Sequence, residues 1–240
     1  MVLVGTVANT GGGTDSGHVR VYEWRGSSWV QLGQDIDGEA IGDFSGISVS
    51  LSNCGSRLVI GAALNDGDTG DQIDDRGHAR VYEWRCSRWI RLGTDIDGEA
   101  RDDRSGFSVS LSRDGARLAV GGVRNDGDTG DQNDNRGHTR VYNWNRLTGT
   151  WIQIGDDIDG RGDNLRAGGA VDLSRHGDIV AIYSSGVLGS TGAGVDIYKY
   201  LKQQQTPCSS CHCNRGCYSY CSCDCYRACG GHLSPKTPWR

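Results

Sequence analysis

The sequence predicts an all-β protein: a β-propeller of about four 4-stranded antiparallel blades, the first and last incomplete, followed by an irregular cysteine-rich tail. Two observations predict this fold. A unit of sixty residues that begins at Gly17 recurs without a gap at Gly77, and a more divergent copy begins at Gly137. Each copy holds four short strand-like runs, the first of which alternates with the two-residue period of a β-strand, and no run in the chain has helical periodicity. We therefore expect residues 1–201 to form propeller repeats.

Composition and charge narrow the classes of function. The 240 residues include 38 glycines but only 3 prolines, which suits short strands joined by tight turns. The net charge of −5 disfavours nucleic acid as a partner, because phosphate binding requires a basic surface. The sequence has no run of about 18 apolar residues, so we expect no membrane span.

The start of the chain aligns with the middle of a repeat. Residues 3–5 correspond to residues 59–61 of a later copy. No basic segment followed by a long apolar run stands at the start, so we expect no signal peptide. These features predict a fragment or a truncated product whose first blade lacks its first strand.

The first two strands of each blade are joined by a tight turn. In the first strand, apolar residues alternate with small polar ones. Asp114 and Gly115 then form a two-residue turn, which is a strong hairpin signal. First strands are expected at residues 46–52, 106–112 and 168–174, and second strands at residues 2–5, 57–62, 117–122 and 178–183.

Aromatic residues mark the third and fourth strands, where a blade is widest. A tryptophan ends the third strand and another begins the fourth in three copies: Trp24 and Trp29, Trp84 and Trp89, and Trp144 and Trp151. Facing aromatic residues contribute roughly 0.5–1.5 kcal/mol beyond their buried area, so we interpret these pairs as structural. Third strands are expected at residues 18–24, 78–84, 138–144 and 194–200, and fourth strands at 29–32, 89–92 and 151–154, which leaves the last blade without a fourth strand.

The composition changes at residue 202, where we place a domain boundary. Residues 202–240 are expected to form a polar linker and a cysteine-rich tail. Three interpretations of the tail remain open: a disulfide-bonded knot, a thiolate site for a soft metal, or an unselected sequence after a frameshift. Its cysteines are Cys208, Cys211, Cys213, Cys217, Cys221, Cys223, Cys225 and Cys229, and the two others, Cys54 and Cys86, lie in predicted turns.

The strand motifs resemble the FG-GAP repeats of integrin α-chain propellers and their microbial relatives. Residues 107–109 follow Gly106 where that family has its Phe-Gly and Ser-Val positions, while residues 120–121 and 141–142 match its Val-Gly and Val-Tyr positions. The resemblance covers residues 2–201 and implies an adhesion module at or outside the cell surface. The family's proline is absent. Its calcium loops are replaced by tight turns with too few oxygens for the 6–8 ligands of Ca²⁺.

An acidic loop occurs in two copies and offers a different candidate for Ca²⁺. Hard carboxylate oxygens on a glycine-rich loop suit this ion, and a cation would relieve their mutual repulsion. The alternative is a solvated acidic loop without an ion. The candidate ligands are Asp66, Asp68, Asp71, Asp74, Asp126, Asp128, Asp131 and Asp134.

Two further motifs are candidate binding sites. Arg161, Gly162 and Asp163 resemble the tripeptide that integrins recognise, and they lie in a predicted exposed connector. A histidine also begins the third strand in three copies, at positions 18, 78 and 138. Because the histidines recur once per blade, we expect them to be structural rather than to converge on a metal.

The function predicted from these features is a non-catalytic binding or adhesion module that recognises protein or glycan through loops on one face, with Ca²⁺ as a candidate cofactor. The sequence lacks the nucleophile-elbow, zinc-protease and phosphate-loop motifs, so we expect no enzyme. The alternatives are a propeller-based polysaccharide hydrolase or lyase and a scaffold without its own ligand. Four blades could close into a ring or belong to a larger propeller, and open edges would favour self-association.

Overall fold

The computed structural model describes residues 1–6, 14–67, 73–127, 134–186, 193–200 and 233–235. In these residues the chain forms four antiparallel sheets and no helix. The first sheet consists of β1 (Val2–Thr6), β2 (His18–Trp24), β3 (Trp29–Gln31) and β4 (Ile36–Asp37). The second consists of β5 (Ser48–Leu51), β6 (Arg57–Ala62), β7 (His78–Arg85), β8 (Arg88–Arg91) and β9 (Ile96–Asp97).

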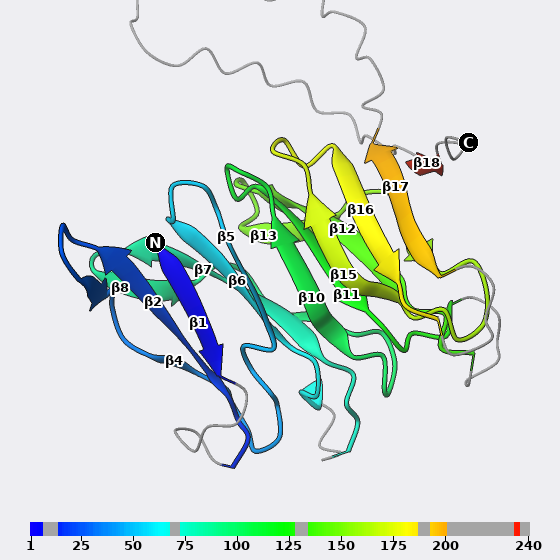
Figure 1. The fold of residues 1–240 in the computed structure, drawn as a ribbon, viewed down its shortest axis with the longest axis horizontal. Helices are drawn as coiled ribbons and strands as arrows, with labels where there is room; N and C mark the ends of the chain where they lie inside the picture. The colour runs from blue at the N-terminus through cyan, green and yellow to red at the C-terminus, as the bar shows by residue number, and fades with distance from the viewer. Residues whose placement is uncertain (7–13, 68–72, 128–133, 187–192, 201–232, 236–240) are drawn as a thin grey trace, which may run out of the picture.

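The other two sheets follow the same plan, and all four stand side by side as blades (Figure 1). The third blade consists of β10 (Ser105–Leu111), β11 (Arg117–Gly122), β12 (His138–Asn145), β13 (Thr150–Gln153) and β14 (Ile158–Asp159). The fourth consists of β15 (Ala167–Leu173), β16 (Ile179–Ser184), β17 (Gly194–Tyr200) and β18 (Leu233–Pro235). The predicted fold class is confirmed.

Two features of the strand order differ from the sequence-based prediction. The short strands β4, β9 and β14 pair with the third strand of their blades, and they were not predicted because two residues show no periodicity. The prediction that the last blade lacks a fourth strand is wrong, since β18 pairs with β17. β18 lies far along the chain in the predicted tail, where proximity in sequence gives no indication of pairing.

The hydrophobic core lies between the blades rather than inside them. Leu58 and Ile60 on β6 pack against the first blade, while Val59 between them packs against the third. This alternation buries every residue of β6, because both faces of the sheet are covered. A third cluster joins the last two blades through Val141 and Ile182, among others.

Glycine allows the first two strands of neighbouring blades to approach each other closely. A Cβ atom at Gly61 would collide with the carbonyl oxygen of Gly106 in the next blade, and one at Gly121 would collide with that of Gly168. Tyr183 holds the equivalent position in the fourth blade and is 44% exposed. The position therefore requires glycine only where another blade follows.

The tryptophan pairs connect blades as well as strands. Within each pair the ring centroids lie 5.1–5.4 Å apart. The Nε1 atom of Trp89 also donates a hydrogen bond of 2.8 Å to the carbonyl oxygen of Leu32 in the preceding blade. Trp29 on the first blade is 49% exposed, whereas Trp89 is 4% exposed.

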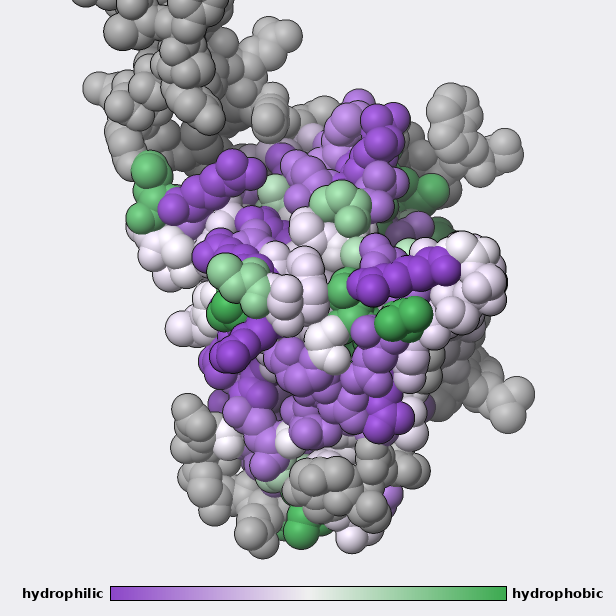
Figure 2. Space-filling model, turned by 90° about the vertical axis from the view of Figure 1, so that its left-hand side faces the viewer, coloured by the Kyte–Doolittle hydropathy of each residue, from purple (hydrophilic) through white to green (hydrophobic). Residues whose placement is uncertain are grey.

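The outer face of the first blade carries mainly hydrophilic side chains, with scattered hydrophobic ones (Figure 2). At the other end of the row, the fourth blade exposes Val195 and Ile197, which are 63% and 55% exposed. Their counterparts Val19 and Val21 on the first blade are fully buried by the second. No helix among the described residues is long and apolar enough to cross a membrane.

Candidate functional site

The described aspartates of the acidic loops form hydrogen bonds with other residues of the same loop. Asp66 Oδ1 accepts hydrogen bonds of 2.9 and 3.1 Å from the amides of Asp74 and Asp75. Asp74 in turn accepts a hydrogen bond of 2.9 Å from Arg76 Nε. The same pattern recurs in the next copy, where Asp126 binds the amide of Asn135 and Asp134 binds Arg136. The remaining candidates, Asp68, Asp71, Asp128 and Asp131, lie outside the described residues.

The adhesion-like tripeptide is engaged in ion pairs at both ends. Arg161 Nη2 lies 2.8 Å from Asp196 of β17, and Asp163 lies 2.7 Å from Arg136 Nη2. All eight tail cysteines lie outside the described residues. Cys54 and Cys86 are exposed free thiols.

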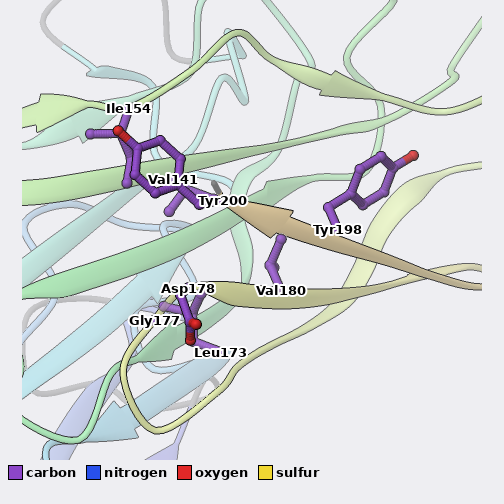
Figure 3. Close-up of a pocket in the computed structure, with 8 residues that line it drawn as sticks. All are labelled: Val141, Ile154, Leu173, Gly177, Asp178, Val180, Tyr198 and Tyr200. Atoms are coloured by element: carbon purple, nitrogen blue, oxygen red, sulfur yellow. The ribbon is translucent and has the colours of Figure 1, made fainter. Parts of the chain in front are cut away.

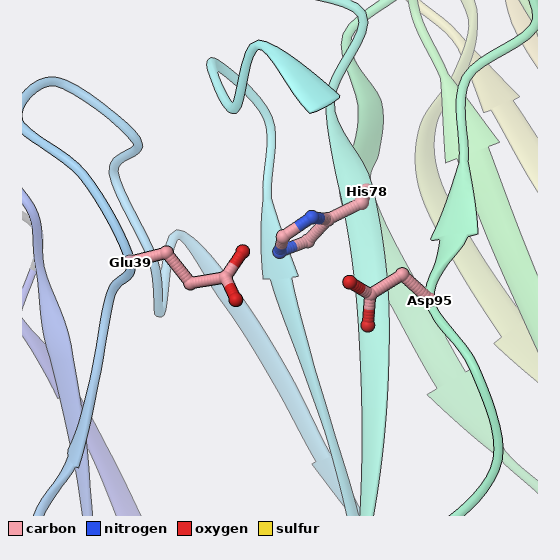
Figure 4. Close-up of side chains that lie close together, drawn as sticks. All are labelled: Glu39, His78 and Asp95. Carbon is pink, nitrogen blue, oxygen red and sulfur yellow. The ribbon is translucent and has the colours of Figure 1, made fainter. Parts of the chain in front are cut away.

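Two of the recurring histidines meet carboxylates at blade interfaces, an arrangement that the sequence analysis missed. Glu39 comes from the connector of the first blade, while His78 and Asp95 belong to the second (Figure 4). Their ligand atoms all lie within 4.8 Å of one another. The equivalent group at the next interface is Glu99, His138 and Asp157. The signal in the sequence was joint recurrence of all three residue types, followed by loss of the glutamate in the connector of the third blade and of the histidine in the fourth blade.

Buried aspartates fix the turns that carry the two glutamates. Asp43 Oδ2 accepts hydrogen bonds of 3.0 and 2.8 Å from the amides of Glu39 and Ala40. Asp103 makes the same pair of bonds to the amides at positions 99 and 100. Burial raises the pKa of Asp43. The third connector has Arg161 and Leu165 at these two positions, so glutamate and its supporting aspartate are lost together.

The first of these clusters is neutralised by its own arginines. Arg80 makes hydrogen bonds of 2.8 Å to both carboxylate oxygens of Asp95 and also contacts Glu39. Burial opposes ionisation of Asp95, but the contacts with Arg80 outweigh it and hold the pKa of Asp95 below its usual range. Burial, assisted by the charge of Arg80, lowers the pKa of His78 to about 4. His78 is therefore neutral at physiological pH.

A cavity of about 260 Å³ opens between the third and fourth blades at the ends of their first two strands. Its walls combine aromatic and cationic groups. The exposed rings are Phe107 and Tyr183. The lining residues are Arg104, Phe107, Val123, Arg124, Arg166, Gly169, Tyr183 and Ser185.

The three arginines of this cavity are held in different ways. Asp102 accepts hydrogen bonds from Arg104 Nε at 3.1 Å and from Arg124 Nη1 at 2.6 Å. Arg166 Nε is buried and has no hydrogen-bond partner among the described residues. Asp75 Oδ2 lies 4.0 Å from Arg104 Nη2, and burial raises the pKa of Asp75. Buried polar atoms are usually paired, so Arg166 has donor capacity for a ligand.

The cavity is not a feature of the repeat. The second blade has Phe44 at the position equivalent to Arg104 and Arg166, and it has Leu64 where the third blade has Arg124. The backbone has the same conformation at the three equivalent residues, with a φ angle of 55° at Phe44 and Arg104 and 50° at Arg166. Only the side chains have changed. Departure from the repeat was the signal in the sequence that could have identified this site.

A second cavity lies between the same blades but is too small for a ligand. Its volume is about 10 Å³, and Val141, Ile154, Leu173 and Val180 line it together with Tyr200 (Figure 3). A space of this size holds at most one water molecule. It is a packing gap in the core.

Comparison with solved structures identifies the architecture. No protein-family profile and no curated protein matches the sequence. A putative 6-phosphogluconolactonase from Bacteroides uniformis superposes with a TM-score of 0.50 at 12% identity, over 78% of this chain and 46% of that chain. A periplasmic gluconolactonase from Pseudomonas aeruginosa superposes with a TM-score of 0.44 at 16% identity, over 83% of this chain and 50% of that chain. The WD40 repeats of RRP9 superpose with a TM-score of 0.42 at 15% identity, over 80% of this chain and 47% of that chain.

The fold is a β-propeller. The chain spans about half the length of these solved neighbours. They do not single out the FG-GAP family that the strand motifs resemble. The prediction that the chain is not an enzyme is contradicted, because a structure named as a putative lactonase shares its fold. The absence of a familiar catalytic motif in a propeller is therefore no argument against catalysis.

Proposed function

We propose that this propeller binds an anionic, sugar-derived ligand in the cavity between its third and fourth blades and acts on it as a hydrolase. The observation that carries the proposal is the set of Arg104, Arg124 and Arg166 around one cavity that also presents two exposed aromatic rings. Asp102 compensates part of this positive charge. The remaining charge selects for an anion.

The chemistry of the cavity suits a carboxylated or phosphorylated sugar. The planar guanidinium of arginine binds carboxylate and phosphate through two parallel hydrogen bonds. Phe107 and Tyr183 offer flat apolar surfaces for the ring of a sugar. The volume of about 260 Å³ lies just below the usual range of about 300–1,000 Å³ for ligand pockets. It favours a single sugar unit over a long segment of polysaccharide.

Asp75 is the proposed general base: it does not line the cavity itself, but its Oδ2 atom lies 4.0 Å from Nη2 of the lining residue Arg104. The raised pKa of Asp75 brings it closer to the pH at which a base works best. In hydrolysis of a sugar-derived ester, Asp75 would take a proton from water while the water oxygen bonds to the carbonyl carbon. The arginines would stabilise the negative charge that develops on the carbonyl oxygen. The bond to the leaving alkoxide then breaks, and the alkoxide receives the proton. Lactones belong in the substrate panel because the matched structure from Bacteroides uniformis is named for one.

Binding is tested by calorimetry with glucuronate, galacturonate and glucose 6-phosphate, with glucose as the neutral control. We expect the anionic sugars to bind and glucose to bind at least tenfold more weakly. Arg166→Gln should weaken anion binding about 10-fold or more, since a charged hydrogen bond contributes about 1.5–3 kcal/mol. Arg113→Gln alters an exposed turn and should leave binding unchanged. Equal binding of glucose, or none of any sugar, would contradict the proposal.

Hydrolysis of sugar lactones is measured by proton release, and hydrolysis of polyuronates is measured by the new reducing ends that it creates. Asp75→Asn should lower kcat by about 10²–10⁴-fold, the usual contribution of a general base, and should leave the affinity for the anionic sugar unchanged. Binding without turnover of any of these substrates would contradict the enzymatic half of the proposal.

A further inference from the structure

The cluster of Glu99, His138 and Asp157 lies at the interface of the second and third blades. Glu99 follows β9, His138 is the first residue of β12, and Asp157 precedes β14. His138 Nδ1 lies 3.2 Å from Asp157 Oδ2 and 3.9 Å from Glu99 Oε2. One nitrogen and two carboxylate oxygens thus converge from two blades.

Two buried nitrogen atoms at this cluster have no hydrogen-bond partner among the described residues. One is His138 Nδ1, whose side chain is only 1% exposed and therefore has little access to water. The contact with Asp157 lacks the alignment of a hydrogen bond. The other is Arg140 Nε. A buried donor or acceptor without a partner destabilises the fold, and a ligand bound to His138 Nδ1 would remove that penalty.

The equivalent cluster at the preceding interface differs in its charge. There Glu39 and Asp95 contribute two negative charges, and Arg80 and Arg91 both contact Asp95 and contribute two positive charges. The sum is zero.

At the second cluster Gln153 stands in place of Arg91 and donates a hydrogen bond of 2.5 Å to Asp157. Arg140 turns to the carbonyl oxygen of Asp97 at 2.7 Å and lies 3.4 Å from Glu99. Glu99 and Asp157 carry two negative charges against the single positive charge of Arg140. One negative charge is left uncompensated.

We propose that Glu99, His138 and Asp157 bind one divalent transition-metal ion of the Zn²⁺ class. Imidazole nitrogen with carboxylate oxygen is a ligand set that such ions accept at about 2.0–2.2 Å. Tetrahedral geometry at that bond length separates neighbouring ligands by roughly 3.3–3.6 Å, close to the contacts of 3.2 and 3.9 Å that His138 makes. Three protein ligands leave a coordination position open. The site is separate from the arginine-lined cavity and does not depend on the function proposed for it.

Co²⁺ is a suitable probe, because its visible absorption reports the ligand geometry. The full-length chain is freed of metal with a chelator and its cysteines are blocked with iodoacetamide, so that thiolates of the tail cannot bind the ion. We expect one equivalent of Co²⁺ to produce a spectrum of nitrogen and oxygen ligation, and Zn²⁺ to displace it. Equilibrium dialysis gives the stoichiometry independently.

Three variants locate the ion. His138→Ala should weaken Co²⁺ binding about 10-fold or more, since even the partners of metal ligands are worth 10–100-fold. Gln153→Arg installs the arginine that the second blade carries, so it should abolish binding while keeping a side chain that the fold accepts. His78→Ala at the neutral cluster is the matched control and should bind Co²⁺ like the unmodified sequence.

Circular dichroism and a melting curve establish that each variant is folded. If His138→Ala does not fold, Gln153→Arg decides alone. Absence of Co²⁺ binding at millimolar concentration would overturn the proposal. So would retention of binding in the folded variants at positions 138 and 153, or equal loss of binding in His78→Ala.

Discussion

At the scale of single residues, recurrence and departure have different meanings in this chain. His78, Glu39 and Asp95 recur with the repeat and form a neutralised contact between blades. Arg124 and Arg166, in contrast, stand at positions where the second blade has the apolar residues Leu64 and Phe44. Recurring positions directed the prediction of ligands to the acidic loops, whereas the arginines stand where the repeat changes and were not predicted.

Burial of His78 makes stability depend on pH. Its pKa is about 4 in the folded state against 6.5 in the unfolded state, so the unfolded state binds more protons between these values. The stabilisation is fully present above pH 6.5 and is lost as the pH falls toward 4, by up to about 3 kcal/mol. Urea unfolding of the native sequence and of His78→Gln should show a smaller decline for the variant across this window.

His176→Gln, which removes a histidine from an exposed turn, controls for the loss of one titrating side chain. Parallel curves for the native sequence and His78→Gln would contradict the prediction.

At the scale of the strands, the sequence pattern was sufficient to predict the longer strands. It did not predict strands of two residues, or a strand that pairs with a partner far away in the sequence. β6 and β11 were predicted because each is a largely apolar run of six residues that follows a tight turn. β4 offers only two residues, and its pairing with β2 arises from the chain turning back along the blade. β18 pairs with β17 across the segment 201–232, and no local pattern marks that contact.

The tryptophan hairpins allow a direct test of packing between blades. Trp89→Phe removes the hydrogen bond to Leu32 and leaves a buried carbonyl oxygen without that donor, which should cost about 1–3 kcal/mol. Trp29→Phe makes the same chemical change at a ring that is 49% exposed and has no adjoining blade among the described residues. It should change stability by less than about 0.5 kcal/mol. Chemical denaturation measures both. Equal destabilisation would show that the tryptophans act only within their own hairpins.

At the scale of the whole molecule, the blades form a row in which the described strands of each blade pack on those of the adjacent blades. Such arrays have a stability that sums blade and interface contributions. The second and third blades are covered on both faces, whereas the fourth exposes Val195 and Ile197. The repeat made this architecture predictable, because one unit implies all of its copies. Recurrence and departure from the repeat mark the residues of the two clusters and the cavity, but the sequence does not show that they meet, because they come from adjacent blades.

Hydrogen exchange should reflect this arrangement. We expect the strongest protection in β6, β7, β11 and β12, and faster exchange in β1, β2 and β17, because the terminal blades can open without disturbing two interfaces. Mass spectrometry after pepsin digestion resolves these segments. Uniform protection across the four blades at low protein concentration would contradict the prediction, and protection of β17 that rises with concentration would indicate self-association.

Tyr183 makes the fourth blade differ from the others in its ability to accept a following blade. Gly61 and Gly121 admit the backbone of the following blade, but the fourth blade has a phenol ring at that position. A duplicated copy of the second or third blade could be inserted between them, since it would bring its glycine with it. The same copy placed on the fourth blade would meet the ring of Tyr183. A change in blade number by internal duplication is therefore compatible with the middle of this propeller and incompatible with its fourth blade until position 183 becomes glycine.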